Sequence, residues 1–79
     1  MTEVGRRLSQ DPDALFRLRM QAGLTQGQLA ERAGLSKGFV SKLESGKSSA
    51  SAEALNRLAK ALGRPVVALM PDEPLRRPA

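Results

Sequence analysis

Apolar side chains recur at helical spacing along most of the chain, and capping residues bracket each apolar stretch. The first stripe consists of Leu15, Leu18 and Ala22. It follows an Asp-Pro-Asp sequence at 11–13 and ends before Gly23. Because aspartate caps helices, proline suits the first helical position and glycine favours the position after the last turn, the pattern predicts a helix over residues 12–22.

Two shorter helices joined by a tight turn are predicted next. Thr25 and Gln28 have the spacing of a capping box, and Gly34 falls where a left-handed residue ends a helix. Ser36 then caps a second helix, which Gly46 ends. A helix, a glycine-containing turn and a helix form the arrangement that places the second helix in a DNA groove.

The second of these helices, over residues 37–45, has two chemically different sides. At about 100° per residue, Phe39, Val40 and Leu43 fall on one side. The opposite side carries Lys37, Gly38, Ser41, Lys42 and Ser45. Small polar side chains allow close approach and lysines favour anions, which suits a helix in the major groove of DNA. The alternative interpretation is an ordinary solvated helix face.

The two last predicted helices span residues 52–62 and 65–70. Ser51 and Gly63 stand at the ends of the longer one. In the shorter one, Leu69 is expected to close the core, while Val66 and Val67 are candidates for a subunit contact.

The pattern as a whole predicts an all-α fold, a compact five-helix bundle over residues 12–70. Residues 1–11 are expected to form an N-terminal arm or a short extra helix, in which Arg6 and Arg7 are placed to reach a phosphate backbone. Residues 71–79 contain three prolines and alternating charge, so a disordered tail is expected there.

Composition narrows the possible functions. The 79 residues carry a formal net charge of +5 and a sequence pI near 10.8, in the range of nucleic-acid binders. With no cysteine and no histidine, disulfides and the usual zinc sites are excluded, and we expect no metal and no cofactor. The chain also lacks a phosphate-binding glycine loop and a convincing carboxylate pair, so an enzyme is not expected. No apolar run or signal peptide is visible, which predicts a cytoplasmic protein without a membrane partner.

The order and spacing of these residues resemble the Cro and phage-repressor type of helix-turn-helix protein, also called XRE-like. The matching residues are Leu18, Arg19, the sequences GLTQ at 23–26, LAE at 29–31, AGLS at 33–36, VS at 40–41 and LESGK at 43–47, Leu55, and LAKALG at 58–63. The resemblance covers about residues 14–70. It implies the DNA-binding-domain fold of phage repressors and a bacterial or phage transcription regulator.

Together with this resemblance, the residues predict a sequence-specific regulator of double-stranded DNA. We expect a repressor that binds a palindromic operator as a homodimer. Lys37, Gly38, Ser41 and Lys42 are the candidates for reading base edges. Gln26, Ser36, Ser45, Lys47 and Ser49 are the candidates for phosphate contacts. The resemblance also implies a structural ion pair between Arg19 and Glu44.

A second hypothesis is an antitoxin-type interaction module whose main role is to bind a partner protein. Phe16 and Met20, four residues apart, form an apolar pair outside the first stripe. Either the N-terminal segment covers this pair or it faces a protein partner, and the tail offers another contact for one. No small-molecule effector is expected, because the chain leaves no room for a sensing domain. RNA is disfavoured, because exposed aromatic residues that stack unpaired bases are lacking.

Overall fold

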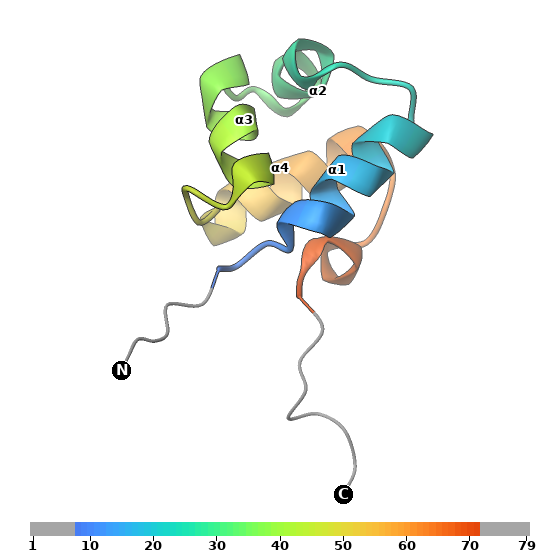
Figure 1. Cartoon of the computed structure of the whole chain (residues 1–79). Coiled ribbons are helices and arrows are strands. Elements are labelled where there is room, and N and C mark those ends of the chain that lie inside the picture. The colour runs from blue at the N-terminus through green and yellow to red at the C-terminus, as the bar shows by residue number, and fades with distance from the viewer. Residues whose placement is uncertain (1–7, 72–79) are drawn as a thin grey trace, which may run out of the picture.

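The structure, a computed structural model, describes residues 8–71. Its elements, in order, are α1 (Pro12–Gln21), α2 (Gln26–Ala33), α3 (Lys37–Ser45), α4 (Ala52–Leu62) and a short 3₁₀ helix, η1 (Val66–Leu69) (Figure 1). Residues 8–71 contain no strand, which confirms the all-α fold. The expectations for the N-terminal arm before residue 8 and for the tail after residue 71 lie outside the described part of the chain.

Helix boundaries follow the capping residues read from the sequence. The Thr25 hydroxyl accepts a hydrogen bond from the Gln28 backbone N–H, and the Gln28 side chain accepts one from the Thr25 N–H, so the capping box is complete. Asp11, Ser36 and Ser51 cap α1, α3 and α4 through side-chain oxygens. Gly34, Gly46 and Gly63 end α2, α3 and α4 in the left-handed conformation. Local chemistry therefore accounts for these boundaries.

The predicted fifth helix is wrong in kind, because residues 66–69 form a single 3₁₀ turn and the bundle has four α-helices. Pro65 is not the first helical residue; it has an extended backbone, with ψ at 152°, and its side chain supplies no cap. Met70 is again extended, and Pro71 follows it. Between two such ends, four residues can complete a tight turn but cannot propagate an α-helix.

The core is made of one aliphatic side chain from each element. Leu15, Leu29, Leu43, Leu58 and Leu69 are fully buried. Complete burial of a leucine contributes about 1.5–3 kcal/mol to folding. Ala22, predicted to belong to this core, is exposed instead, because α1 already ends at Gln21.

The helices pack so that α3 is supported from two sides. α2 packs against both α3 and α4, and α1 packs against α3 and η1. In Figure 1, α2 and α3 lie at one end of the molecule, with α1 and α4 crossing beneath them. The inner side of α3 therefore rests on the core, while its outer side is free to meet another molecule.

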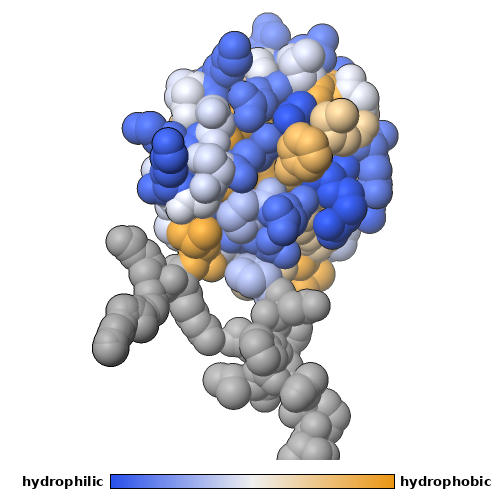
Figure 2. All heavy atoms as spheres, in the orientation of Figure 1, coloured by the Kyte–Doolittle hydropathy of each residue, from blue (hydrophilic) through white to orange (hydrophobic). Residues whose placement is uncertain are grey.

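Much of the surface in Figure 2 is hydrophilic, with a few separate apolar patches. The large apolar residues that remain exposed lie in two places: Phe16 and Met20 on α1, and Val67 and Met70 at η1. Among residues 8–71, no helix is long and apolar enough to cross a membrane.

Candidate nucleic-acid interface

The two sides of α3 differ in the structure as the helical spacing predicts. Val40 and Leu43 are fully buried, and Phe39 is partly buried against the core. All the residues expected on the other side are exposed: Lys37, Gly38, Ser41, Lys42 and Ser45. This outward face of α3 combines two ammonium groups with small side chains, so a negatively charged surface can approach the helix backbone closely.

A buried ion pair fixes the end of α3 to α1. The Arg19 guanidinium donates to both carboxylate oxygens of Glu44, over 2.6 Å from Nε and 3.0 Å from Nη2. The two side chains are only 10% and 6% exposed. The hydrogen bond from Glu44 raises the pKa of Arg19 further above its ordinary value, so this arginine stays charged at every physiological pH. A bidentate pair of this kind restrains direction as well as distance.

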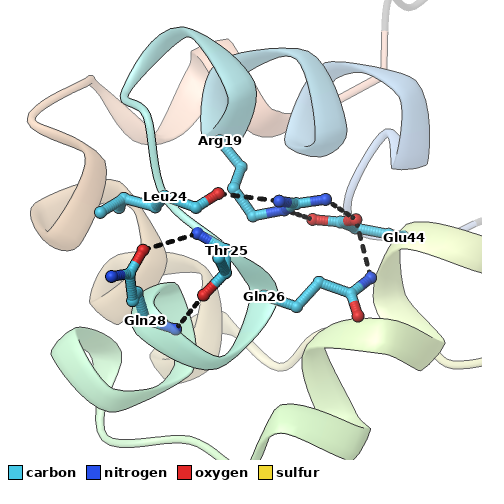
Figure 3. Close-up of polar contacts among 6 residues, drawn as sticks. All are labelled: Arg19, Leu24, Thr25, Gln26, Gln28 and Glu44. Carbon is cyan, nitrogen blue, oxygen red and sulfur yellow. Dashed lines mark hydrogen bonds and ion pairs between the residues drawn. The ribbon is translucent and has the colours of Figure 1, made fainter.

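The same ion pair also holds the start of α2, as Figure 3 shows. The third nitrogen of Arg19, Nη1, donates to the Leu24 carbonyl over 2.8 Å. Gln26, the first residue of α2, donates from its side-chain nitrogen to Glu44 over 3.0 Å. That amide nitrogen carries a second hydrogen, which is available to another acceptor. Arg19 and Glu44 thus join three helices, and Gln26 is oriented by the pair.

Phe16 lies over the Arg19 guanidinium, with 5.4 Å between Cζ and the ring centroid. The ring is 49% exposed and occupies the next turn of α1. A cation–π contact at this distance favours the charged arginine. The aromatic side chain therefore has an intramolecular role in addition to its exposed surface.

A shallow hollow separates the first turn of α2 from the start of α3. Its lining includes Met20, Gln26, Gly27 and Lys37. A Cβ atom at Gly27 would lie 3.9 Å from Cδ of Lys37, so the lysine stem passes directly over this glycine. Lys37 is therefore shared between the outward face of α3 and the first turn of α2, where backbone N–H groups lack helical partners.

The serines predicted to contact phosphate differ in their free hydrogens. The Ser36 hydroxyl accepts from the Phe39 N–H over 3.0 Å, which leaves its own hydrogen available. The Ser45 hydroxyl instead donates to the Lys42 carbonyl over 3.2 Å. The Ser49 oxygen accepts from the Ser9 N–H over 2.9 Å and lies 3.1 Å from the Ser9 hydroxyl. Because phosphate oxygens only accept hydrogen bonds, Ser36 is the best prepared of the three.

Gln10 is a residue that sequence reasoning missed. Its side chain is fully buried and bonds to backbone groups of α3 and of the loop after α3. It lies ahead of the α1 cap, where helical periodicity carries no information, so only a tertiary structure could reveal its partners.

Comparison with known proteins places the chain in a family. The helix-turn-helix family model matches residues 15–69, and the chain belongs to this family. No curated protein sequence matches the chain significantly. Within the described residues there is also no cluster of three side chains able to hold a metal ion.

Solved structures agree with this assignment. The restriction-modification controller protein C.AhdI from Aeromonas hydrophila is 32% identical, with a TM-score of 0.73 over 75% of this chain and 89% of that one. The clp gene regulator ClgR from Corynebacterium glutamicum is 38% identical, with a TM-score of 0.67 over 71% of this chain and 73% of that one. A hypothetical transcription factor from Neisseria, NHTF, is 22% identical and shares the fold, with a TM-score of 0.66 over 95% of this chain and 96% of that one.

The fold, the outward face of α3 and the family together define the class of the protein. It is a DNA-binding transcription regulator of the XRE-type helix-turn-helix family. Because this is a family of non-enzymatic DNA-binding proteins, the expectation that the chain is not an enzyme is confirmed.

Proposed function

We propose that the protein is a sequence-specific repressor that binds a palindromic operator as a homodimer. The observation that carries this proposal is the outward face of α3, which is exposed along its whole length and fixed in direction by the Arg19–Glu44 ion pair. A rigidly held helix with free cationic and hydroxyl groups suits the major groove, where base edges are distinguishable.

Lys37, Ser41 and Lys42 are the proposed base-reading side chains, all of them exposed on α3. Lysine favours O6 and N7 of guanine, whereas serine can donate or accept and so discriminates less sharply. Gly38 has nothing within 4 Å of the position a Cβ would take, so its surface is open to a thymine methyl or a sugar edge.

The proposed phosphate contacts surround this helix, from Gln26 and Ser36 at one end to Ser45, Lys47 and Ser49 at the other. Lys47 is exposed and carries three donors, Ser36 keeps its hydroxyl hydrogen, and Gln26 keeps one amide hydrogen. Ser45 and Ser49 would have to exchange an internal hydrogen bond for one to phosphate. We therefore expect Lys47, Ser36 and Gln26 to contribute most of this binding.

The homodimer follows from how little DNA one domain can read. A single reading helix contacts a few base pairs, each worth about 1–3 kcal/mol of discrimination, which cannot select one site in a genome. Two copies related by a two-fold axis read two half-sites about 34 Å apart on a palindrome. The exposed Val67, beside the partly buried Val66, supports a subunit contact at η1.

Paired lysine variants test the proposal. Lys42→Ala should relax the sequence preference and cost about 1–3 kcal/mol at one base position. Lys47→Ala should weaken binding to all duplexes alike and lower the slope of log affinity against log salt by about 1. Lys60→Ala, which removes the same charge from the far end of α4, is the matched control and should change neither quantity appreciably. An unchanged sequence preference in Lys42→Ala would refute its base-reading role.

A second candidate function, an antitoxin-type interaction module, is favoured by the exposure of Phe16 and Met20, at 49% and 56%. An apolar pair on one helix face can anchor a protein partner. The contact of Phe16 with Arg19 gives this ring a role inside the domain, which weakens that argument. Loss of partner binding in Met20→Glu, with DNA binding intact, would support the module.

A further inference from the structure

The side-chain amide of Gln10 is fully engaged with backbone groups that follow Val40 in the chain. Its nitrogen donates to the carbonyls of Leu43 and Ser48, over 3.0 and 2.8 Å. Its oxygen accepts from the N–H of Ala50 over 2.9 Å. Both amide hydrogens and one oxygen lone pair are therefore used, in a site from which water is excluded.

These partners belong to the last turn of α3 and to the loop at residues 47–50. The first part of that loop is held by α3 itself, because the N–H groups of Lys47 and Ser48 both point to the Lys42 carbonyl, at 2.9 and 3.4 Å. The second part has no such support from α3. It is held by Gln10 and by the pair of hydrogen bonds between Ser9 and Ser49. Figure 1 shows the segment before α1 running beside this loop.

We propose that Gln10 is a positioning residue for the DNA backbone contacts of the 47–50 loop. This inference rests on the proposed DNA-binding role of Lys47 and Ser49. Gln10 touches no DNA in this proposal; it holds the backbone from which those side chains extend. Without it, two carbonyls and one N–H lose their buried partner, and the loop must be ordered at the moment of binding.

The chemistry of the pocket explains why glutamine is suited to it. Two of its three partners are acceptors and the third is a donor, so the site needs one group that does both. A glutamate would place its carboxylate oxygens against the two carbonyls, and a methionine would fill the space without bonding. Gln10→Met therefore removes the hydrogen bonds and retains the apolar volume.

The test measures duplex affinity as a function of salt for the full chain and its variants. Gln10→Met should lower the slope of log affinity against log salt by about 1–2, because each lost phosphate contact removes about 0.9. Lys47→Ala should lower that slope less in the Gln10→Met background than in the wild-type chain. Gly63→Ala, a destabilising change at the far end of α4, should leave the slope of the folded protein unchanged.

Either of two results would overturn the inference. One is a wild-type salt slope in folded Gln10→Met; the other is full additivity of the Gln10→Met and Lys47→Ala effects. If the wild-type chain itself shows no salt-dependent duplex binding, the proposed function fails along with the inference. If the wild-type chain binds and Gln10→Met binds with the same slope, only the inference fails.

Hydrogen exchange on the wild-type chain provides a second test if Gln10→Met does not fold. The Ala50 amide, held by Gln10, should exchange only through the same opening that exposes the core amides of α3. An exchange rate orders of magnitude faster than that of Leu43 would show that Gln10 does not hold the loop, and would overturn the inference.

Discussion

Arg19 shows how one side chain can determine the geometry of a recognition surface. Its guanidinium reaches a carboxylate on α3 and a carbonyl ahead of α2, and Phe16 lies over it. Every donor group that the structure assigns to it has a partner within 3.0 Å. Because both charges of the ion pair are nearly buried, the energy of the arrangement depends on the presence of both partners.

A double-mutant cycle at Arg19 and Glu44 measures this dependence. Glu44→Gln or Arg19→Met alone should cost about 3–5 kcal/mol of unfolding free energy, because each leaves a buried charge without its partner. The double variant should cost clearly less than the sum, as measured by denaturant unfolding. Additive costs would show that the two side chains act independently and that the pair does not fix α3.

At the scale of elements, the glycine that ends α2 combines two requirements. Gly34 has φ at +71°, and a Cβ there would lie 2.7 Å from Nη1 of Arg57. Arg57 also donates to the Ala33 carbonyl over 3.4 Å and pairs with Glu53. The turn between α2 and α3 thus depends on backbone conformation and on the space next to α4.

Gly34→Ala and Gly63→Ala separate these two requirements. Gly63 has nearly the same φ, +68°, and nothing within 4 Å of its Cβ position, so its replacement should cost only the left-handed penalty of about 1–2 kcal/mol. Gly34→Ala should cost more, by about 0.3–1 kcal/mol, because Arg57 is displaced from the C-terminus of α2. Thermal or urea unfolding compares the two.

Arg57→Ala provides the control for this comparison. In that background, Gly34→Ala should cost the same as Gly63→Ala, since no side chain remains to be displaced. Equal costs of the two glycine changes in the wild-type background would contradict a steric role for Arg57.

The elements also show which features the sequence can predict. The boundaries of α2, α3 and α4 depend on residues within a few positions of each helix end, such as Thr25, Ser36 and Gly46, so local chemistry determines them. The outward face of α3 follows from periodicity alone. In contrast, the partners of Gln10 lie 33 to 40 residues away, and no local pattern contains that information.

The same distinction explains the errors. The turn at η1 depends on how Pro65 leaves α4 and on the closing of the core by Leu69, so its helical type could not be read from four apolar residues. The Ser49 hydroxyl was free in the sequence, yet in the fold it meets Ser9, forty positions earlier. Candidate site residues can be named from the sequence, but which of their donors remain free depends on tertiary contacts.

At the scale of the whole molecule, the proposed subunit contact is tested at η1. Val67 is 65% exposed, so Val67→Glu should prevent association without disturbing the monomer core. Sedimentation or light scattering should then report a monomer, and operator affinity should fall with it. Met20→Glu introduces the same charge on α1 at a similarly exposed position and should leave the mass unchanged. A dimer that persists in Val67→Glu would exclude this contact.

The central claim is that two copies of this domain read a two-fold symmetric DNA sequence. Selection of bound duplexes from a randomised pool, at near-physiological salt, tests it most directly. The account predicts a palindromic motif whose half-sites lie about one helical turn, 10–10.5 base pairs, apart. Recovery of no motif, with binding that disappears as salt rises, would contradict it, because only nonspecific attraction to phosphate would remain.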